Sequence, residues 1–231
     1  MNRLRQDCVF KWNHPLTEIN RRKLCLLNIV SWDRHIQHFL SDKVSASNAY
    51  IFCFTEAHVN DYSFNRIDTF LSSWKDIHKD GLAICYNTLN VKVLHQNFQQ
   101  ITSIKLLPLL LEVDGEQLFL VLVYRPPSHP IANFVLNLTQ EISHLIMSID
   151  IDIKKCRTLI LGDFNMDQML PENIDRFQIF CKYFHFIQRS KYTTHNKGGI
   201  LDLVFDNNTI AHPVKWMPTP YSDHFILLVD F

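Results

Sequence analysis

The sequence predicts an α/β fold in which two packed β-sheets are flanked by helices. Segments with the residue pattern of β-strands outnumber those with helical periodicity, and the helical segments lie between strands along the chain. Neighbouring strand patterns in residues 81–95 and 103–126 indicate hairpins, whose strands pair antiparallel. A single doubly wound sheet is the alternative, but it is built mainly from parallel strands and agrees less well with these hairpins.

Strand patterns dominate the chain up to residue 126. One stretch, residues 31–42, has the helical spacing of apolar side chains instead. The two longest strands are predicted within residues 103–126 and turn at VDGE, because an Asp-Gly pair favours a tight hairpin turn. The shorter predicted strands are KLCLLNI (23–29), AYIFCFTE (49–56), GLAICYN (81–87) and VKVLHQ (91–96). We expect the last two of these to pair as a hairpin.

Helices and strands alternate in the remainder of the chain. Residues 131–149 carry apolar side chains on one helical face, which predicts an amphipathic helix. A second helix is predicted near residues 172–183, with Pro171 and Glu172 early in its first turn. The predicted strands are RTLILGDFN (157–165), GILDLVFD (199–206) and HFILLVDF (224–231).

The composition is that of a soluble globular protein, with 47% apolar and 20% charged residues among 231. We expect one domain in residues 23–231, preceded by a polar N-terminal lead-in in residues 1–22. No apolar run approaches the ~20 residues that span a bilayer, so we expect no membrane association. The six cysteines lie mostly in apolar runs, which predicts buried thiols in a reducing, intracellular compartment. Since the formal charge is +0, affinity for nucleic acid must come from a local patch or a bound cation.

Polar side chains recur at the ends of the predicted apolar strands. Because successive strand residues point to opposite faces, Asp163 and Asn165 are expected to point to the same side. Taken singly, Asn28 could cap a helix, Glu56 could be a solvated loop residue, and GDFN could be a turn. Asp202 within an apolar strand is harder to explain, because an unpaired buried carboxylate costs several kcal/mol. The full set is Asn28, Glu56, Tyr124, Arg125, Asp163, Asn165, Asp202, Asp223 and His224.

Such a set meets the needs of phosphodiester hydrolysis. The reaction requires a divalent cation, a group that orients or deprotonates water, and donors for the charge on the phosphoryl oxygens. Carboxylate and amide oxygens are the ligands that Mg²⁺ prefers, which suits Glu56. Asp163 can align a water molecule, and Asn165 can donate to that water or to the phosphate.

The remaining side chains of the set supply donors and positive charge. A histidine held by a carboxylate, as His224 would be by Asp202, keeps one tautomer and gains cationic character. Such an imidazole can stabilise a pentacovalent phosphorane. Tyr124 and Arg125 are further candidate donors to phosphate, arginine in its bidentate geometry.

The order of these residues resembles that of the motifs of the endonuclease/exonuclease/phosphatase superfamily. This superfamily includes apurinic/apyrimidinic endonucleases, DNase I-type nucleases, inositol-polyphosphate 5-phosphatases and sphingomyelinases. The resemblance covers residues 23–231 and implies a four-layered α/β sandwich with the active site at one end of two mixed sheets. The matching motifs are Asn28, Glu56, Tyr124, GDFN (162–165), LD (201–202) and SDH (222–224). The resemblance implies catalytic roles for Asp163, Asn165, His224, Asp202 and Tyr124, and metal-binding roles for Glu56, Asn28 and Asp223.

Three longer stretches resemble the endonuclease regions of LINE-type retrotransposons and Helitron-like mobile elements. They are VYRPP (123–127), YTTHNKGGILDLVFDN (192–207) and YSDH (221–224). The resemblance implies a DNA nickase that depends on Mg²⁺ or Mn²⁺ and leaves a 3′-hydroxyl. It also implies a monomer derived from, or fused to, a reverse transcriptase or helicase polyprotein, and nuclear if it acts on chromosomal DNA. The expected substrate-binding residues are Arg125, Thr194, His195 and Lys197.

The sequence departs from the family pattern at Val30, where relatives commonly carry an acidic residue or asparagine, and at Thr55, where they carry glutamine. The Val30 departure keeps open an inactive remnant that only binds. A phosphomonoesterase or phospholipase of the same fold is a further alternative. A polar loop before a strand would equally explain Thr194 and His195. The tryptophans Trp32, Trp74 and Trp216 could stack on bases, although core packing is the more ordinary explanation.

Overall fold

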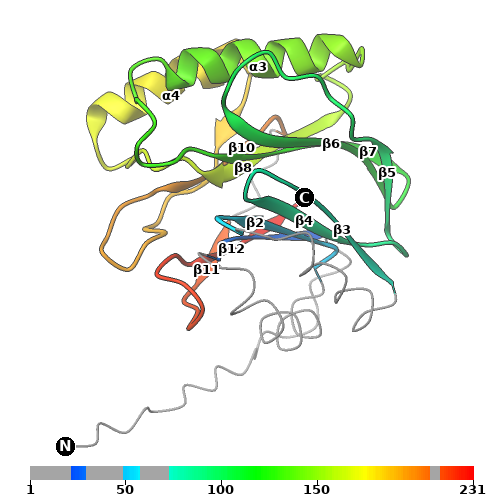
Figure 1. Ribbon diagram of the computed structural model, residues 1–231, viewed down its shortest axis with the longest axis horizontal. Helices are drawn as coiled ribbons and strands as arrows, with labels where there is room; N and C mark the ends of the chain where they lie inside the picture. Colours follow the sequence, from blue (N-terminus) through cyan, green and yellow to red (C-terminus); the bar gives the residue numbers. More distant parts are fainter. Residues whose placement is uncertain (1–21, 30–48, 58–72, 209–213) are drawn as a thin grey trace, which may run out of the picture.

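The computed structural model describes residues 22–29, 49–57, 73–208 and 214–231. Two six-stranded sheets lie face to face, and two helices, α3 (Phe134–Ser148) and α4 (Pro171–Phe184), cover the outer face of one of them (Figure 1). The prediction of two packed mixed sheets is confirmed. Residues 1–21 of the predicted N-terminal lead-in and the helix expected at residues 31–42 lie outside the described residues. In the part of the chain that is described, no helix is both long and apolar enough to cross a membrane.

The first sheet has the strand order β11-β12-β1-β2-β4-β3. Strands β1 and β2 pair parallel, and the other neighbours pair antiparallel. Its strands are β1 (Lys23–Asn28), β2 (Ile51–Thr55), β3 (Trp74–Lys79), β4 (Leu82–Asn87), β11 (Lys215–Met217) and β12 (Ile226–Asp230).

The second sheet has the order β5-β6-β7-β8-β10-β9. Its one parallel pair is β7 and β8, and the strands on either side run antiparallel. Its strands are β5 (Val91–His95), β6 (Lys105–Val113), β7 (Glu116–Tyr124), β8 (Arg157–Asp163), β9 (Ile187–Gln188) and β10 (Asp202–Asp206).

The hairpin predicted from GLAICYN and VKVLHQ does not form. Strand β4 pairs with β3 and β2 in the first sheet, whereas β5 pairs with β6 in the second. The tight turn lies earlier, at Asp80 and Gly81, whose φ angles of 54° and 83° suit the turn that joins two antiparallel strands. The chain between β4 and β5 therefore crosses from one sheet to the other.

Alternation along the strands divides the core into layers. Leu24 and Leu26 of β1 belong to the cluster between the two sheets, whereas Cys25 and Leu27 belong to a second cluster on the outer face of the first sheet. A third cluster packs the second sheet against α3 and α4. Trp74 lies in the outer-face cluster with its ring centroid 5.3 Å from that of Phe52, so its predicted role in core packing is confirmed.

Polar residues replace apolar ones where the inter-sheet core reaches one end of the molecule. In β1, Leu24 and Leu26 face the other sheet, and the next residue on that face is Asn28. In four other strands, too, the residue two positions from an inter-sheet core residue is polar at this end. The polar residues reached in this way are Asn28, Thr55, Tyr124, Asp163 and Asp202.

Candidate active site

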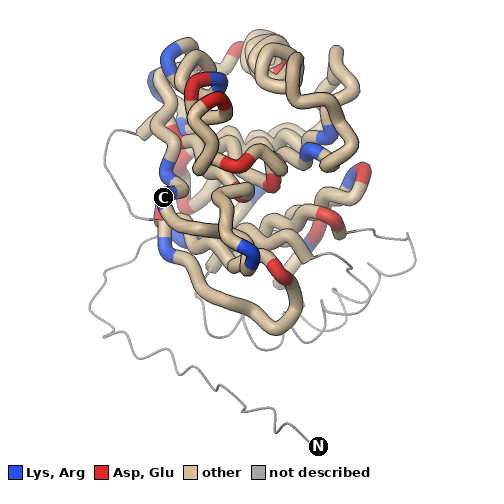
Figure 2. Tube along the Cα trace, turned by 90° about the vertical axis from the view of Figure 1, so that its left-hand side faces the viewer, with Lys and Arg blue, Asp and Glu red and all other residues tan. Residues whose placement is uncertain are grey.

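Two hydrogen bonds between side chains join the two sheets at this end of the molecule. Asn28 at the end of β1 donates through Nδ2 to Oδ2 of Asp163 at the end of β8, at 2.8 Å. Tyr124 at the end of β7 donates its hydroxyl proton to Oε1 of Glu56, which follows β2, at 2.7 Å. Figure 2 looks onto this end of the molecule, and acidic residues lie near the centre of the view. The predicted residues from four separate strands therefore meet.

The GDFN segment folds around the carboxylate of Asp163. Asn165 has a φ of 47°, which turns the chain back so that its backbone N–H donates to Oδ1 of Asp163 at 2.9 Å. Its side-chain Nδ2 donates to Oδ2 of Asp163 at 3.0 Å and to the carbonyl of Arg125 at 2.9 Å. With Asn28, three N–H groups hold a carboxylate that is 0% exposed. Asp163 and Asn165 are brought together as predicted, although through a tight turn rather than along one strand face.

Two buried carboxylates lie opposite each other in neighbouring strands. Asp163 of β8 and Asp202 of β10 are register partners. Burial, together with the negative charge of Asp202, raises the pKa of Asp163 to about 7, although His224 and the hydrogen bonds of Asn165 and Asn28 oppose the rise. A carboxyl group with a pKa near neutrality is suited to accept a proton from water.

His224 is held by Asp202. Its Nδ1 lies 2.8 Å from Oδ2 of Asp202, and both side chains are buried. Burial alone would lower the pKa of His224, but the hydrogen bond and charge of Asp202, with the charges of Asp163 and Asp223, raise it to about 9. The imidazole is therefore a cation at neutral pH, and its Nε2–H is the donor not used by Asp202.

A second imidazole packs edge-on against the first. The ring centroids of His195 and His224 are 4.8 Å apart at 90°. Nδ1 of His195 accepts the backbone N–H of Lys197 at 3.1 Å, which places the proton of the neutral ring on Nε2. That Nε2 lies 3.2 Å from Oδ2 of Asp223, so His195 donates to Asp223. We therefore find His195 in contact with site residues, and its direct contact with substrate stays a prediction.

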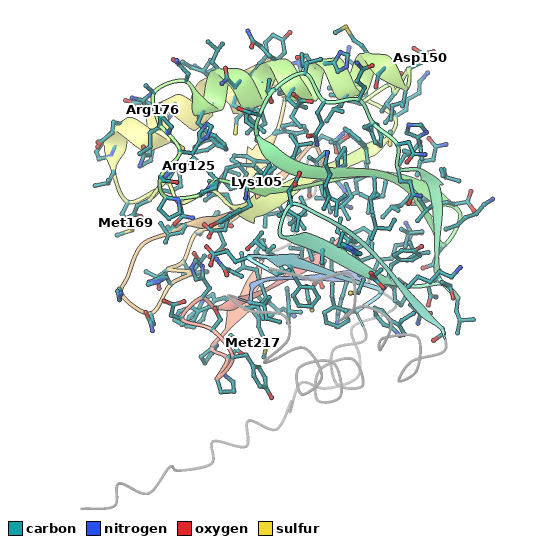
Figure 3. All side chains as sticks on the ribbon, in the orientation of Figure 1. Lys105, Arg125, Asp150, Met169, Arg176 and Met217 are labelled. Carbon is teal, nitrogen blue, oxygen red and sulfur yellow. The ribbon has the colours of Figure 1, made fainter. Side chains whose placement is uncertain are left out.

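The expected phosphate contact of Arg125 is wrong. Arg125 is 2% exposed and donates to backbone carbonyls of two loops, namely those of Phe164, Asn165, Pro126 and His129. The guanidinium therefore ties the GDFN segment to the segment after β7. Figure 3 shows it at the end of the second sheet.

Replacing Arg125 by lysine is expected to destabilise the protein by at least about 2 kcal/mol, because an ammonium group cannot reach four carbonyl oxygens and each buried acceptor left unpaired costs about 1–3 kcal/mol. The free energy of unfolding in urea measures this. Arg176→Lys is the matched control, since Arg176 donates a long hydrogen bond of 3.4 Å to Ala132. Equal stability of the two variants would contradict the structural role of Arg125.

Thr194 also has a structural role instead of the expected contact with substrate. It is 1% exposed, and its Oγ1 accepts the backbone N–H groups of Leu201 and Asp202, each at 3.0 Å. This contact fixes the start of β10 and so the position of the Asp202 carboxylate. Lys197 is exposed at the tip of the same loop, and its contact with substrate stays a prediction.

Two further residues at the site were not predicted. Thr55 is fully buried beside Asn28 in the β1–β2 register, and its Oγ1 has no hydrogen-bond partner among the described residues. Lys105 pairs with Tyr124 across the β6–β7 hairpin, and its Nζ lies 5.8 Å from the centroid of the tyrosine ring. Lys105, labelled beside Arg125 in Figure 3, is thus a cation close to the site.

The donor set at this end fits a hard divalent cation. Carboxylate, carboxamide and hydroxyl oxygens converge here, and Oδ1 of Asp202 is buried without a hydrogen-bond partner in the described part of the chain. Among the described residues, two groups of three His, Asp or Glu side chains have ligand atoms within 4.8 Å of one another: His195, Asp223 and His224, and Asp163, Asp202 and His224. Glu56 is in neither group, so the predicted association of Glu56 with Asp223 stays a prediction.

Comparison with known proteins identifies the fold. No family model and no curated protein sequence matches the chain. The endonuclease domain of TRAS1, a telomere-specific non-LTR retrotransposon, matches in structure with a TM-score of 0.68 and 13% identity, over 90% of this chain and 97% of that one. A mannosyl-6-phosphatase of Bacteroides thetaiotaomicron matches with a TM-score of 0.65 and 11% identity, over 90% and 98%. An AP endonuclease of Archaeoglobus fulgidus matches with a TM-score of 0.62 and 14% identity, over 90% and 98%. The chain has the fold of endonuclease/exonuclease/phosphatase proteins.

Proposed function

We propose that this chain is a metal-dependent phosphodiesterase that nicks DNA and leaves a 3′-hydroxyl. The observation that carries the proposal is the convergence of Asp163, Asp202 and His224 in one buried group at the end of both sheets. It unites a carboxyl group suited to accept a proton with an imidazolium suited to bind a phosphate oxygen. Proteins of known structure with this fold include endonucleases and a phosphatase, so hydrolysis of phosphate esters is the common chemistry.

In the proposed reaction Asp163 accepts the proton of the attacking water. The N–H groups of Asn28 and Asn165 donate to both carboxylate oxygens, which fixes the orientation of the carboxylate relative to the attacking water. The pKa of about 7 for Asp163 lets it act as a base near neutral pH. Attack by the water oxygen forms the new phosphorus–oxygen bond, and the bond from phosphorus to the 3′-oxygen of the preceding nucleotide breaks. The leaving 3′-oxygen takes a proton from solvent and becomes the 3′-hydroxyl.

His224 would stabilise the negative charge that develops on the phosphoryl oxygens. Asp202 binds Nδ1 in a buried ion pair, and this contact fixes the orientation of the imidazole ring and so of its Nε2–H. Lys105, close to the ring of Tyr124, adds a second positive charge where Arg125 had been expected.

Mg²⁺ or Mn²⁺ would be held by Glu56 and Asn28, with Asp223 as a further candidate ligand, and would supply Lewis-acid stabilisation of the phosphate. Tyr124 orients the Glu56 carboxylate by donating to Oε1. The second oxygen of Glu56 makes no hydrogen bond to the described residues and is the one proposed to bind the ion.

DNA is the proposed substrate, and a mobile element is the proposed origin, with a reverse transcriptase or helicase as the partner in a longer polyprotein. This is supported by the VYRPP and YSDH motifs and by the structural match to a retrotransposon endonuclease. Because the formal charge is +0, few phosphate contacts contribute, and we propose that a monomer binds DNA with modest, salt-sensitive affinity.

The direct test is nicking of supercoiled plasmid by the full chain with Mg²⁺ or Mn²⁺, followed by extension of the nick with a polymerase. We expect open-circular product whose 3′ ends are extended without prior treatment. An intact plasmid together with phosphate release from sugar or inositol phosphates would favour the phosphatase alternative. A folded protein without activity on either substrate would favour the inactive remnant.

Removal of the proposed metal ligand is expected to abolish stabilisation by metal. At a Mg²⁺ concentration a hundredfold above its Kd, a bound ion stabilises the folded state by about 2.7 kcal/mol. We expect Mg²⁺ to raise the melting temperature of the wild type and of Glu172→Ala, which changes an exposed residue of α4, but not that of Glu56→Ala. An unchanged metal response in Glu56→Ala would exclude Glu56 as a ligand.

A further inference from the structure

Three aromatic rings form an exposed stack next to the candidate active site. The rings of Trp216 and Phe225 are stacked, with centroids 5.2 Å apart and planes inclined by 20°. The ring of Tyr192 lies 6.5 Å from that of Trp216 at 47°. Tyr192 is 61% exposed and Trp216 is 44% exposed, so this aromatic stack faces solvent rather than the core.

The aromatic stack continues the inter-sheet face that carries the site. Trp216 of β11 pairs with Leu227 of β12, which belongs to the inter-sheet core, and paired residues share a face of the sheet. Phe225 directly follows His224, and its backbone N–H donates to the carbonyl of Thr194 at 2.8 Å. Tyr192 precedes Thr194 by two residues. Phe225 and Tyr192 are therefore fixed to segments that also carry site residues, and Trp216 is stacked against Phe225.

The exposed rings of Tyr192 and Trp216 offer surface on which a flat ring can stack. Phe225 is stacked on one face of the Trp216 ring, and 44% of Trp216 is still exposed. The centroid of Tyr192 lies 6.5 Å from that of Trp216, so one bound ring can contact both side chains. We call this exposed position the base slot.

We infer that the aromatic stack binds one unpaired nucleobase of the strand that is cut, next to the scissile phosphate. This inference rests on the proposed function, because the base belongs to the nucleotide next to the phosphate that His224 is proposed to contact. An aromatic ring stacks on any base without reading its sequence. The exposed Lys191, adjacent to Tyr192, offers positive charge to the phosphates of the same strand. A duplex would have to release one base to fill the slot, so an abasic or mismatched neighbour alters the cost of binding.

The test is binding of a single-stranded oligodeoxynucleotide to the full chain in EDTA, where metal-dependent cutting cannot occur. Loss of one stacking partner weakens binding by between about fivefold and a hundredfold, which we expect for Trp216→Ala. Trp216→Phe should recover most of the affinity. The ratio between wild type and Trp216→Ala should stay constant as salt rises, because stacking releases no counterions. We also expect weaker binding for Tyr192→Ala. Its matched control is Tyr183→Ala, since Tyr183 is similarly exposed, at 64%, but lies on α4.

Each outcome separates this inference from the proposed nuclease activity. Binding that depends on Trp216 without nicking of plasmid would support the base slot and count against the nuclease. Nicking by the wild type together with unchanged binding in Trp216→Ala would overturn the base slot and leave the nuclease. Quenching of tryptophan fluorescence by mannose 6-phosphate in the wild type but not in Trp216→Ala, with no such quenching by the oligonucleotide, would show that the rings bind a sugar and would also overturn it.

Discussion

Replacing Asp163 by asparagine is expected to reduce nicking by at least about a hundredfold while the protein stays folded. The substitution removes the proposed proton acceptor. It also places an amide where three N–H groups, from Asn28 and from the backbone and side chain of Asn165, now donate to a carboxylate. Both carboxylate oxygens now accept N–H groups, so the NH₂ group of an asparagine at this position would face another N–H donor instead of an acceptor. The rate of conversion of supercoiled to open-circular plasmid at saturating metal measures the loss.

The control for this prediction makes the same chemical change elsewhere. Asp175 is exposed on α4, and Asp175→Asn should nick at the wild-type rate. Circular dichroism should show that Asp163→Asn is folded. If Asp163→Asn kept more than about a tenth of the wild-type rate, Asp163 would not be the base, since a positioned general base contributes about 10²–10⁴-fold.

Most of the site could be predicted from the sequence because strand alternation is a strictly local rule. In β1 and β8 the inward-facing residues are apolar up to Leu26 and Leu161, two residues before Asn28 and Asp163. This change from apolar to polar is visible in the sequence. Alternation does not say which strands are neighbours. The meeting of Asn28 with Asp163 across two sheets was implied by the family resemblance and is seen directly in the structure.

The errors in the predicted fold come from choosing between two equivalent local signals. Asp80-Gly81 and Asp114-Gly115 are both Asp-Gly turns, and both have positive φ angles in the structure. The predicted fold has a turn only at Asp114-Gly115, so it lacks β3 and pairs β4 with β5. The segments β9 and β11 have only two and three residues, which is too short for a periodic pattern.

The roles of Arg125 and Thr194 could not be predicted because a side chain's partners depend on loops far away in the sequence. A sequence shows that arginine can bind a phosphate, but not that four carbonyl oxygens already surround it. Lys105 could have been found, since extending antiparallel pairing from the turn at Asp114-Gly115 places it opposite Tyr124. The register of a hairpin is set by its turn, so this contact follows from the sequence once the turn is known.

Replacing Gly162 by alanine is expected to cause the largest loss of stability, at least about 4 kcal/mol, because of a steric conflict between β7 and β8 and because its φ of 151° is one that other residues rarely adopt. A Cβ atom on Gly162 would lie 1.8 Å from the carbonyl oxygen of Val123. Val123 and Gly162 are register partners in the parallel β7–β8 pair, so the conflict can be relieved only by separating these strands. Separation would also displace Tyr124 and Asp163, which are the next residues of each strand.

The control for Gly162→Ala measures the cost of an alanine at an ordinary left-handed φ without any steric conflict. Gly115 has a φ of 84°, but a Cβ there would meet no atom within 4 Å, so Gly115→Ala measures the cost of the left-handed conformation alone. We expect that cost to be about 1 kcal/mol. The free energies of unfolding in urea should therefore differ by at least about 3 kcal/mol between the two variants. A difference below about 1 kcal/mol would mean that β7 and β8 can separate locally, and the glycine before Asp163 would then not be required to bring the two sheets' polar residues together.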